Sequence, residues 1–136
     1  MSATMQILQP PGWARPKGFS NGIAVVGKLI FVAGQIGCNG EGKWEAKGFS
    51  GQFKQALKNI LTVLAEAGGG PEHIVRLTWY VLDKHEYLGT RQEVGATYRE
   101  LMGRNFPVMA VVQVSGLVEA EARLEIEATA VLPEAA

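Results

Sequence analysis

The chain has 136 residues, with 13 Lys and Arg against 13 Asp and Glu, so its formal net charge is zero. Strong nucleic-acid binders carry a basic excess, and this balance disfavours a nucleic-acid partner. The single cysteine, Cys38, excludes an internal disulfide framework and a multi-cysteine zinc site, and two histidines make a histidine-rich metal site unexpected. No apolar run approaches the roughly 20 residues of a membrane span.

The length suits a single domain over residues 1–136. No basic-then-apolar stretch marks a secretory signal, so we expect a cytoplasmic protein without a membrane partner. Residues 1–17 are rich in proline and predict an extended N-terminal arm. Two runs of strand character follow at residues 19–26 and 28–34, and Gly27 marks the turn between them.

Residues 34–48 contain five glycines and predict a loop. From Phe53 to Ala67, apolar residues then recur every three or four positions, which predicts one face of a helix. Ser50 is placed to cap the start of this helix, and the glycines at 68–70 with Pro71 are placed to end it.

Residues 74–82 return to strand periodicity. One face of this strand is predicted to carry Val75, Leu77, Trp79 and Val81. Thr90 and Glu93 have the spacing of a capping box, which predicts a second helix that runs to Met102. Residues 107–114 and 123–131 predict two more strands, and the last strand alternates strictly, with Glu125, Glu127 and Thr129 opposite its apolar face.

This order of elements predicts an α+β sandwich, in which two helices pack on one face of a mixed sheet of about five strands. The other face of the sheet combines polar and apolar side chains. A half-apolar face of this size is better covered by another subunit than left in water, so we expect an oligomer.

The residue types alone leave the chemistry open. Glu125 and Glu127 share a sheet face, where a partly buried carboxylate can orient a water as an acid or base, but alternating glutamates also simply solvate an exposed strand. The glycine-rich segment 33–37 suits either an anion-binding loop or an ordinary strand exit. The cations available for a carboxylate are Arg15, Lys17, Arg104 and Arg123, and nothing in the sequence ranks them.

Four segments, at residues 17–21, 31–37, 106–107 and 124–128, resemble motifs of the Rid family, in the order in which the family carries them. That family is also known as YjgF-like or reactive intermediate/imine deaminase, and in older usage as endoribonuclease L-PSP. The resemblance implies a chorismate-mutase-like fold of the bacillus type and a homotrimer with small-molecule clefts between subunits. It also implies hydrolysis of enamines and imines, such as 2-aminoacrylate, without a cofactor or metal.

Three positions follow from this resemblance with little change. Glu125 matches the glutamate that positions the attacking water, and Gly34 matches the glycine of the pocket loop. Phe19 stands where active members have a tyrosine, which keeps the ring and loses the hydroxyl.

Three other positions depart further from the family pattern. Ala33 replaces a serine, Val111 stands where active members often have a cysteine, and Met109 replaces the arginine that binds the substrate carboxylate. Methionine cannot form the bidentate contact of a guanidinium. We therefore expect substrate-binding residues Phe19, Ala33, Gly34, Met109 and Val111 to line a cleft more apolar than that of the deaminases.

Two functions remain open at this stage. One is a hydrolase for an enamine or imine other than 2-aminoacrylate, with Glu125 as the catalytic residue. The other is a trimer that binds or protects an apolar metabolite without catalysis. A ribonuclease follows only from the older family name, and the neutral charge disfavours it.

Overall fold

A computed structural model describes residues 5–134 of the chain. Its main sheet has four strands in the order β3 (Lys28–Gln35), β6 (Leu124–Leu132), β4 (Ile74–Val81) and β5 (Val108–Gln113). Strand β6 is antiparallel to both of its neighbours, whereas β4 and β5 run parallel. The sheet is therefore mixed, as the sequence predicts.

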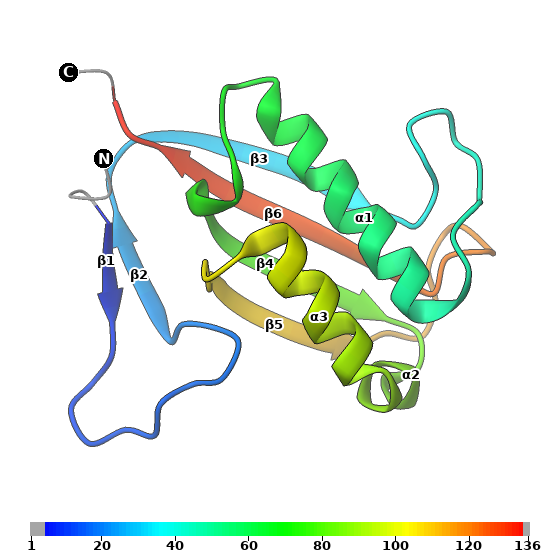
Figure 1. Cartoon of the computed structure of the whole chain (residues 1–136), viewed down its shortest axis with the longest axis horizontal. Coiled ribbons are helices and arrows are strands. Elements are labelled where there is room, and N and C mark those ends of the chain that lie inside the picture. The colour runs from blue at the N-terminus through cyan, green and yellow to red at the C-terminus, as the bar shows by residue number, and fades with distance from the viewer. Residues whose placement is uncertain (1–4, 135–136) are drawn as a thin grey trace.

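Helices α1 (Gly48–Ala65) and α3 (Arg91–Met102) lie on the same face of this sheet (Figure 1). A short helix α2 (Lys84–Gly89), which the sequence pattern does not predict, connects β4 to α3, and a 3-10 turn η2 (Pro71–His73) leads into β4. The architecture confirms the α+β sandwich. Within residues 5–134, no helix is long and apolar enough to cross a bilayer.

The core lies between the two helices and the sheet. Its largest fully buried side chains include Phe53, Leu57, Ile60, Leu77, Leu124 and Ile126. In β6 the buried and accessible positions alternate as predicted, with Glu125, Glu127 and Thr129 on the face that the helices do not cover. This uncovered face also exposes large apolar side chains on β3, where Phe31 is 73% and Leu29 is 61% accessible.

A bulge at the start of β4 overturns one predicted face. The register between β4 and β6 shifts between Ile74 and Arg76, so the alternation slips by one residue at that point. Ile74 is consequently buried in the core, and Val75 instead lines a shallow hollow on the uncovered side, next to Phe31.

The prediction of a fifth strand in the main sheet is also wrong. Strand β2 (Gly22–Val25) does not pair with β3; it pairs with β1 (Met5–Leu8) in a separate two-stranded ribbon, which Figure 1 shows beside the main sheet. Gly27 separates the two sheets with a φ of 155°, and a Cβ there would overlap the end of β6 at Leu132. The close approach of β6 therefore requires glycine at this turn.

Neither predicted helix cap forms. Helix α1 begins before Ser50, whose hydroxyl donates to Glu93 Oε2 in α3 at 2.9 Å, and the Thr90 hydroxyl donates to the carbonyl of Glu86 at 2.7 Å. Ser50 therefore links α1 to α3 and Thr90 links α3 to α2, instead of capping their own helices.

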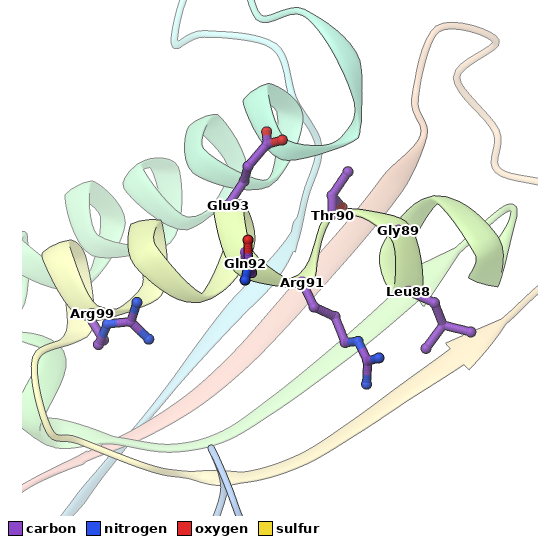
Figure 2. A pocket seen from close by; sticks show the side chains of 7 residues that line it. All are labelled: Leu88, Gly89, Thr90, Arg91, Gln92, Glu93 and Arg99. Atoms are coloured by element: carbon purple, nitrogen blue, oxygen red, sulfur yellow. The ribbon is translucent and has the colours of Figure 1, made fainter.

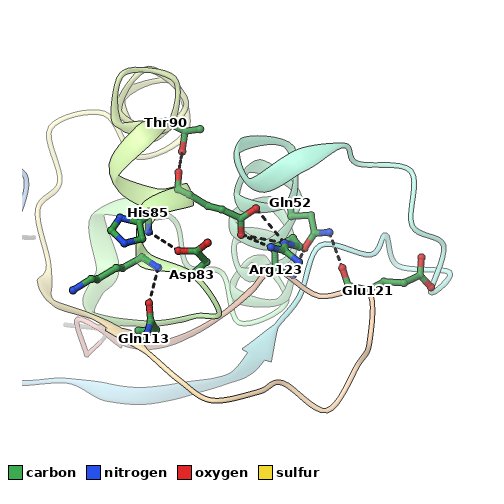
Figure 3. Close-up of polar contacts among 9 residues, drawn as sticks. Gln52, Asp83, His85, Thr90, Gln113, Glu121 and Arg123 are labelled. Atoms are coloured by element: carbon green, nitrogen blue, oxygen red, sulfur yellow. Dashed lines mark hydrogen bonds and ion pairs between the residues drawn. The ribbon is translucent and has the colours of Figure 1, made fainter.

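A polar network closes the sheet end near α2 (Figure 3). Arg123 donates two hydrogen bonds to Glu86 Oε1, from Nε at 3.1 Å and Nη2 at 2.7 Å. The hydrogen bond and charge of Glu86 raise the pKa of Arg123. The buried Gln52 accepts from the Arg123 backbone N–H at 2.7 Å and donates to the Glu121 carbonyl at 2.9 Å. This arrangement fixes the entry to β6, immediately before Glu125.

Candidate substrate site

A cavity of about 580 Å³ lies between α3, strand β5 and the segment that precedes β2. Much of its wall is apolar, formed by Phe19, Trp79, Tyr87, Val94, Met109 and Val111. Three predicted substrate-binding residues, Phe19, Met109 and Val111, therefore line one cavity. Their role in binding stays a prediction, but their proximity is a property of the fold.

The register of β5 explains why two of these residues enter the cavity. Met109 lies opposite the buried Leu77 and Val111 opposite Trp79, so both side chains lie on the helix-covered face of the sheet. Because β5 is the edge strand of the sheet, this part of the face is only partly filled by α3. The strand thus forms the floor of the cavity.

Ser20 holds the neighbouring segment against β5. Its backbone N–H donates to the Pro107 carbonyl at 3.1 Å, and its hydroxyl donates to the Phe106 carbonyl at 2.5 Å. Ser20 also forms an isolated bridge with Val108. These bonds place Phe19 at the cavity although most of the segment around it is exposed.

The other three predicted residues form a second group on the opposite face. Glu125 lies against Gly34: a Cβ built on Gly34 would overlap a carboxylate oxygen of Glu125 and lie 2.8 Å from its Cδ. A register shift between Val32 and Gln35 interrupts the β3–β6 pairing at this point, with Ala33 inside it. Gly34 therefore leaves the space that the Glu125 carboxylate occupies.

The surroundings of Glu125 place it on the uncovered face. It lies opposite Tyr80 of β4, whose hydroxyl donates to Glu127 Oε1. That hydrogen bond is the main reason why the pKa of Tyr80 is raised. Tyr80 does not line the cavity, whereas Trp79, its neighbour on β4, is one of the aromatic residues that do.

One chain therefore carries two groups of the predicted site residues on opposite sides of its sheet. Phe19, Met109 and Val111 lie on the helix-covered side, and Gly34 and Glu125 lie on the other. No movement of side chains brings Met109 and Glu125 together across a packed sheet.

Two arginines of α3, which are absent from the cations expected from the sequence, also line the cavity. Arg91 and Arg99 have no carboxylate partner within 4.0 Å anywhere in residues 5–134. Figure 2 shows the two arginines on the side of α3 away from α1, whereas Glu93 points to α1. Arg91 and Arg99 also border an open groove of about 790 Å³ at the start of α3. Their spacing from Val94 and Tyr98 places all four on one helix face, which is the pattern that could have revealed them.

Two buried polar groups complete the cavity wall. The indole N–H of Trp79 has no hydrogen-bond acceptor among the described residues, and Trp79 is only 3% exposed. The Tyr98 hydroxyl is satisfied, because it donates to the Asn105 carbonyl at 2.6 Å, and burial raises its pKa. Over the described part of the chain, no three His, Cys, Asp or Glu side chains come together as metal ligands.

Comparison with known proteins points to the family that the sequence motifs resemble. Residues 13–132 match the family model described as Endoribonuclease L-PSP. The chain belongs to the Rid family.

Some relatives within the Rid family carry the name of an enzyme, and others carry only a family name. The human 2-iminobutanoate/2-iminopropanoate deaminase is 32% identical over 108 residues, which cover 79% of this chain and 75% of the human protein. The rat deaminase is 36% identical with the same coverage. A RutC family protein of Synechocystis is 31% identical and covers 96% of this chain and 98% of its own length.

Solved structures agree on the Rid fold. A Rid-family protein of unknown function from Yersinia pestis superimposes with a TM-score of 0.80 at 29% identity, over 95% of this chain and 99% of that one. A putative endoribonuclease from Thermotoga maritima gives a TM-score of 0.68 at 26% identity, over 82% and 84% of the two chains. The mixed sheet with helices on one face is thus the fold of this family.

Proposed function

We propose that the protein is a homotrimeric hydrolase that converts an enamine or imine into a carbonyl compound and ammonia. The observation that carries this proposal is the position of the Glu125 carboxylate, which lies against Gly34 on the face that the helices leave uncovered. The names of the human and rat relatives, which are imine deaminases, supply the reaction class.

Assembly of subunits would bring together the two groups of predicted site residues. The uncovered face exposes Phe31 and Leu29, which are apolar side chains that a second subunit can bury. A subunit seated there would present its own cavity, with Phe19 and Met109, to Glu125 of its neighbour. Each complete site would then lie between two chains, which is the arrangement that the family resemblance implies.

The proposed chemistry uses one carboxylate. Glu125 accepts a proton from a water as the water oxygen bonds to the imine carbon and the electrons of the C=N π bond move to nitrogen, and Glu125 then gives this proton to the nitrogen. Glu125 next accepts the hydroxyl proton of the resulting carbinolamine and passes it to the same nitrogen. The C=O bond forms as the C–N bond breaks, and ammonia and a carbonyl compound are the products.

Met109 narrows the substrate class. A methionine on the cavity floor cannot pair with a carboxylate next to the reacting carbon, so 2-aminoacrylate and its imine are poor substrates for this site. The same residue is the specific support for the alternative function, a trimer that binds an apolar metabolite without turnover.

The test is imine hydrolysis by the assembled protein. Imines are generated in situ from a panel of amines, with 2-aminoacrylate included, and release of carbonyl product is followed with wild type, Glu125→Gln and Glu121→Gln. Glu121 is an exposed glutamate four residues upstream whose side chain has no bonded partner among the described residues, so it is the matched control. We expect turnover of at least one uncharged or extended imine by wild type and the control, and loss of about 100-fold or more in Glu125→Gln. Release of carbonyl product by wild type at no more than the uncatalysed rate for every imine would exclude the hydrolase and leave the binding protein, and equal accelerated rates in wild type and Glu125→Gln would exclude Glu125 as the catalytic residue.

A further inference from the structure

We infer that the cavity under α3 takes an organic anion with an apolar body, and that Arg91 and Arg99 bind its charged group in place of the arginine that Met109 replaces. The inference rests on the proposed function for the identity of the reacting group. The binding of the anion stands on the cavity alone.

The first support is that both guanidinium groups are unpaired. Only Arg123 and Lys54, among the basic side chains of the described residues, have a carboxylate within 4.0 Å, so the unpaired state of the exposed Arg91 and Arg99 gains weight from their position rather than from its rarity. Arg91 and Arg99 have no such partner although both border a cavity whose floor is apolar. Two cations beside an apolar surface favour a ligand that combines an anionic group with an apolar one.

The second support is the path of the Arg99 side chain. A Cβ added at Gly95 would lie 3.5 Å from Arg99 Nη1, so the guanidinium folds back over the preceding turn of α3. Arg91 and Arg99 are eight residues apart, or about 12 Å along the helix axis. The folded Arg99 shortens that gap and turns its charge toward the middle of the cavity wall.

The position of the cations sets the shape of this ligand. Position 109 lies on the sheet floor, whereas Arg91 and Arg99 lie on the helix that covers it. In a 2-imino acid the carboxylate is attached to the reacting carbon, so one anchor beside that carbon suffices. An acid bound at the helix wall, with its apolar part on Met109 and Val111, must be separated from the reacting carbon by a spacer. The substrate class is therefore an imine or enamine of an extended, apolar or aromatic carboxylic acid.

The experiment measures binding by isothermal titration calorimetry of the intact, assembled protein. The probes are 3-phenylpropionate, its neutral analogue 3-phenylpropan-1-ol, and the short acid 2-oxobutanoate. We expect 3-phenylpropionate to bind at least about tenfold more tightly than either of the others. Arg91→Gln and Arg99→Gln should each weaken that binding about tenfold and leave the alcohol unaffected, and Arg104→Gln, an exposed arginine outside the cavity, is the matched control.

The outcomes separate this inference from the proposed function. Equal binding of the acid and the alcohol, or unchanged acid binding in the Arg91→Gln/Arg99→Gln double variant, overturns the inference whatever the catalytic activity. Charge-dependent binding by the wild-type protein, together with no turnover of any imine by wild type, keeps the anion site and rejects the hydrolase. Circular dichroism of each variant confirms that the fold is retained.

Discussion

The Cα of Gly34 lies so close to the Glu125 carboxylate that a methyl group at position 34 would sit 2.8 Å from Glu125 Cδ and overlap one of its oxygens. The two residues come from adjacent strands, and the irregular pairing between Val32 and Gln35 brings them together. This contact ties the glycine of the loop to the carboxylate proposed to position water.

Gly34→Ala should therefore impair activity through Glu125. Gly34 does not need a positive φ, so alanine is tolerated by the backbone and the added methyl acts by displacing the carboxylate. We expect a loss of imine hydrolysis approaching that of Glu125→Gln, with a fall in kcat rather than a rise in KM. Gly40→Ala is the control, because a Cβ added at Gly40 would meet nothing within 4 Å, and wild-type kcat in Gly34→Ala would contradict the role of the contact.

Met109→Arg should raise the hydrolysis of 2-aminoacrylate, which the proposed function makes a poor substrate. An arginine on the cavity floor can bind a carboxylate next to the reacting carbon, and each charge-assisted hydrogen bond contributes roughly 1.5–3 kcal/mol. We expect hydrolysis of 2-aminoacrylate to rise at least tenfold, measured by release of keto acid. Val118→Arg places the same charge on a fully exposed loop position and should change nothing; a wild type already as active as the variant would show that Met109 does not limit the substrate.

Phe31→Glu should disrupt the proposed trimer. Phe31 is 73% exposed in the isolated chain, and a charge buried at an interface without a partner is strongly unfavourable. We expect light scattering to report a monomer, with imine hydrolysis lost because Glu125 no longer meets a neighbour's cavity. Val118→Glu adds a charge at another exposed site, away from the sheet, and should leave the assembly intact. A monomeric Phe31→Glu protein with full activity would refute a shared site.

The buried Tyr98 should make stability depend on alkaline pH. Burial raises the pKa of its hydroxyl in the folded chain above the ordinary value of about 10. The contribution is fully present below pH 10, and it is lost at about 1.4 kcal/mol for each pH unit as the pH rises from 10 to the raised pKa of the folded state. Urea unfolding at pH 8 and pH 11 measures the loss.

Tyr98→Phe is the matched variant for this effect. It removes the hydrogen bond to the Asn105 carbonyl and should lower the free energy of unfolding at pH 8 by about 1 kcal/mol. Its further loss between pH 8 and pH 11 should be smaller than that of wild type. An identical alkaline loss in both proteins would show that Tyr98 does not titrate on unfolding.

Local periodicity is enough to predict most of the elements. The alternation in β6 indicates both its faces, and the spacing from Phe53 indicates the buried side of α1. Several of the failures depend on partners distant in sequence. Val75 leaves the core because β6 imposes a bulge on β4, and Ser50 and Glu93 bond to each other because α1 and α3 are neighbours.

The resemblance to the family names candidate site residues, but the sequence does not give their arrangement within one chain. Phe19, Met109 and Val111 are expected with Glu125 in a cleft between subunits, and strand order and register show that the sheet separates them from Glu125 of the same chain. The sequence could have identified Arg91 and Arg99, because their helical spacing places them on the same face as Val94. That spacing does not show which strand the helix covers, so it could not connect these arginines to position 109.

Trp79 and Tyr80 are consecutive residues of β4 that face opposite sides of the sheet, one toward the cavity and one beside Glu125. In a ring of subunits, one strand would then support the binding half of one site and the hydrolytic half of the next. Consider a mixed ring of Glu125→Gln chains and chains whose cavity is blocked. A complete site would form wherever the open cavity of a Glu125→Gln chain meets Glu125 of a chain with a blocked cavity. Two inactive preparations would complement each other when they exchange subunits.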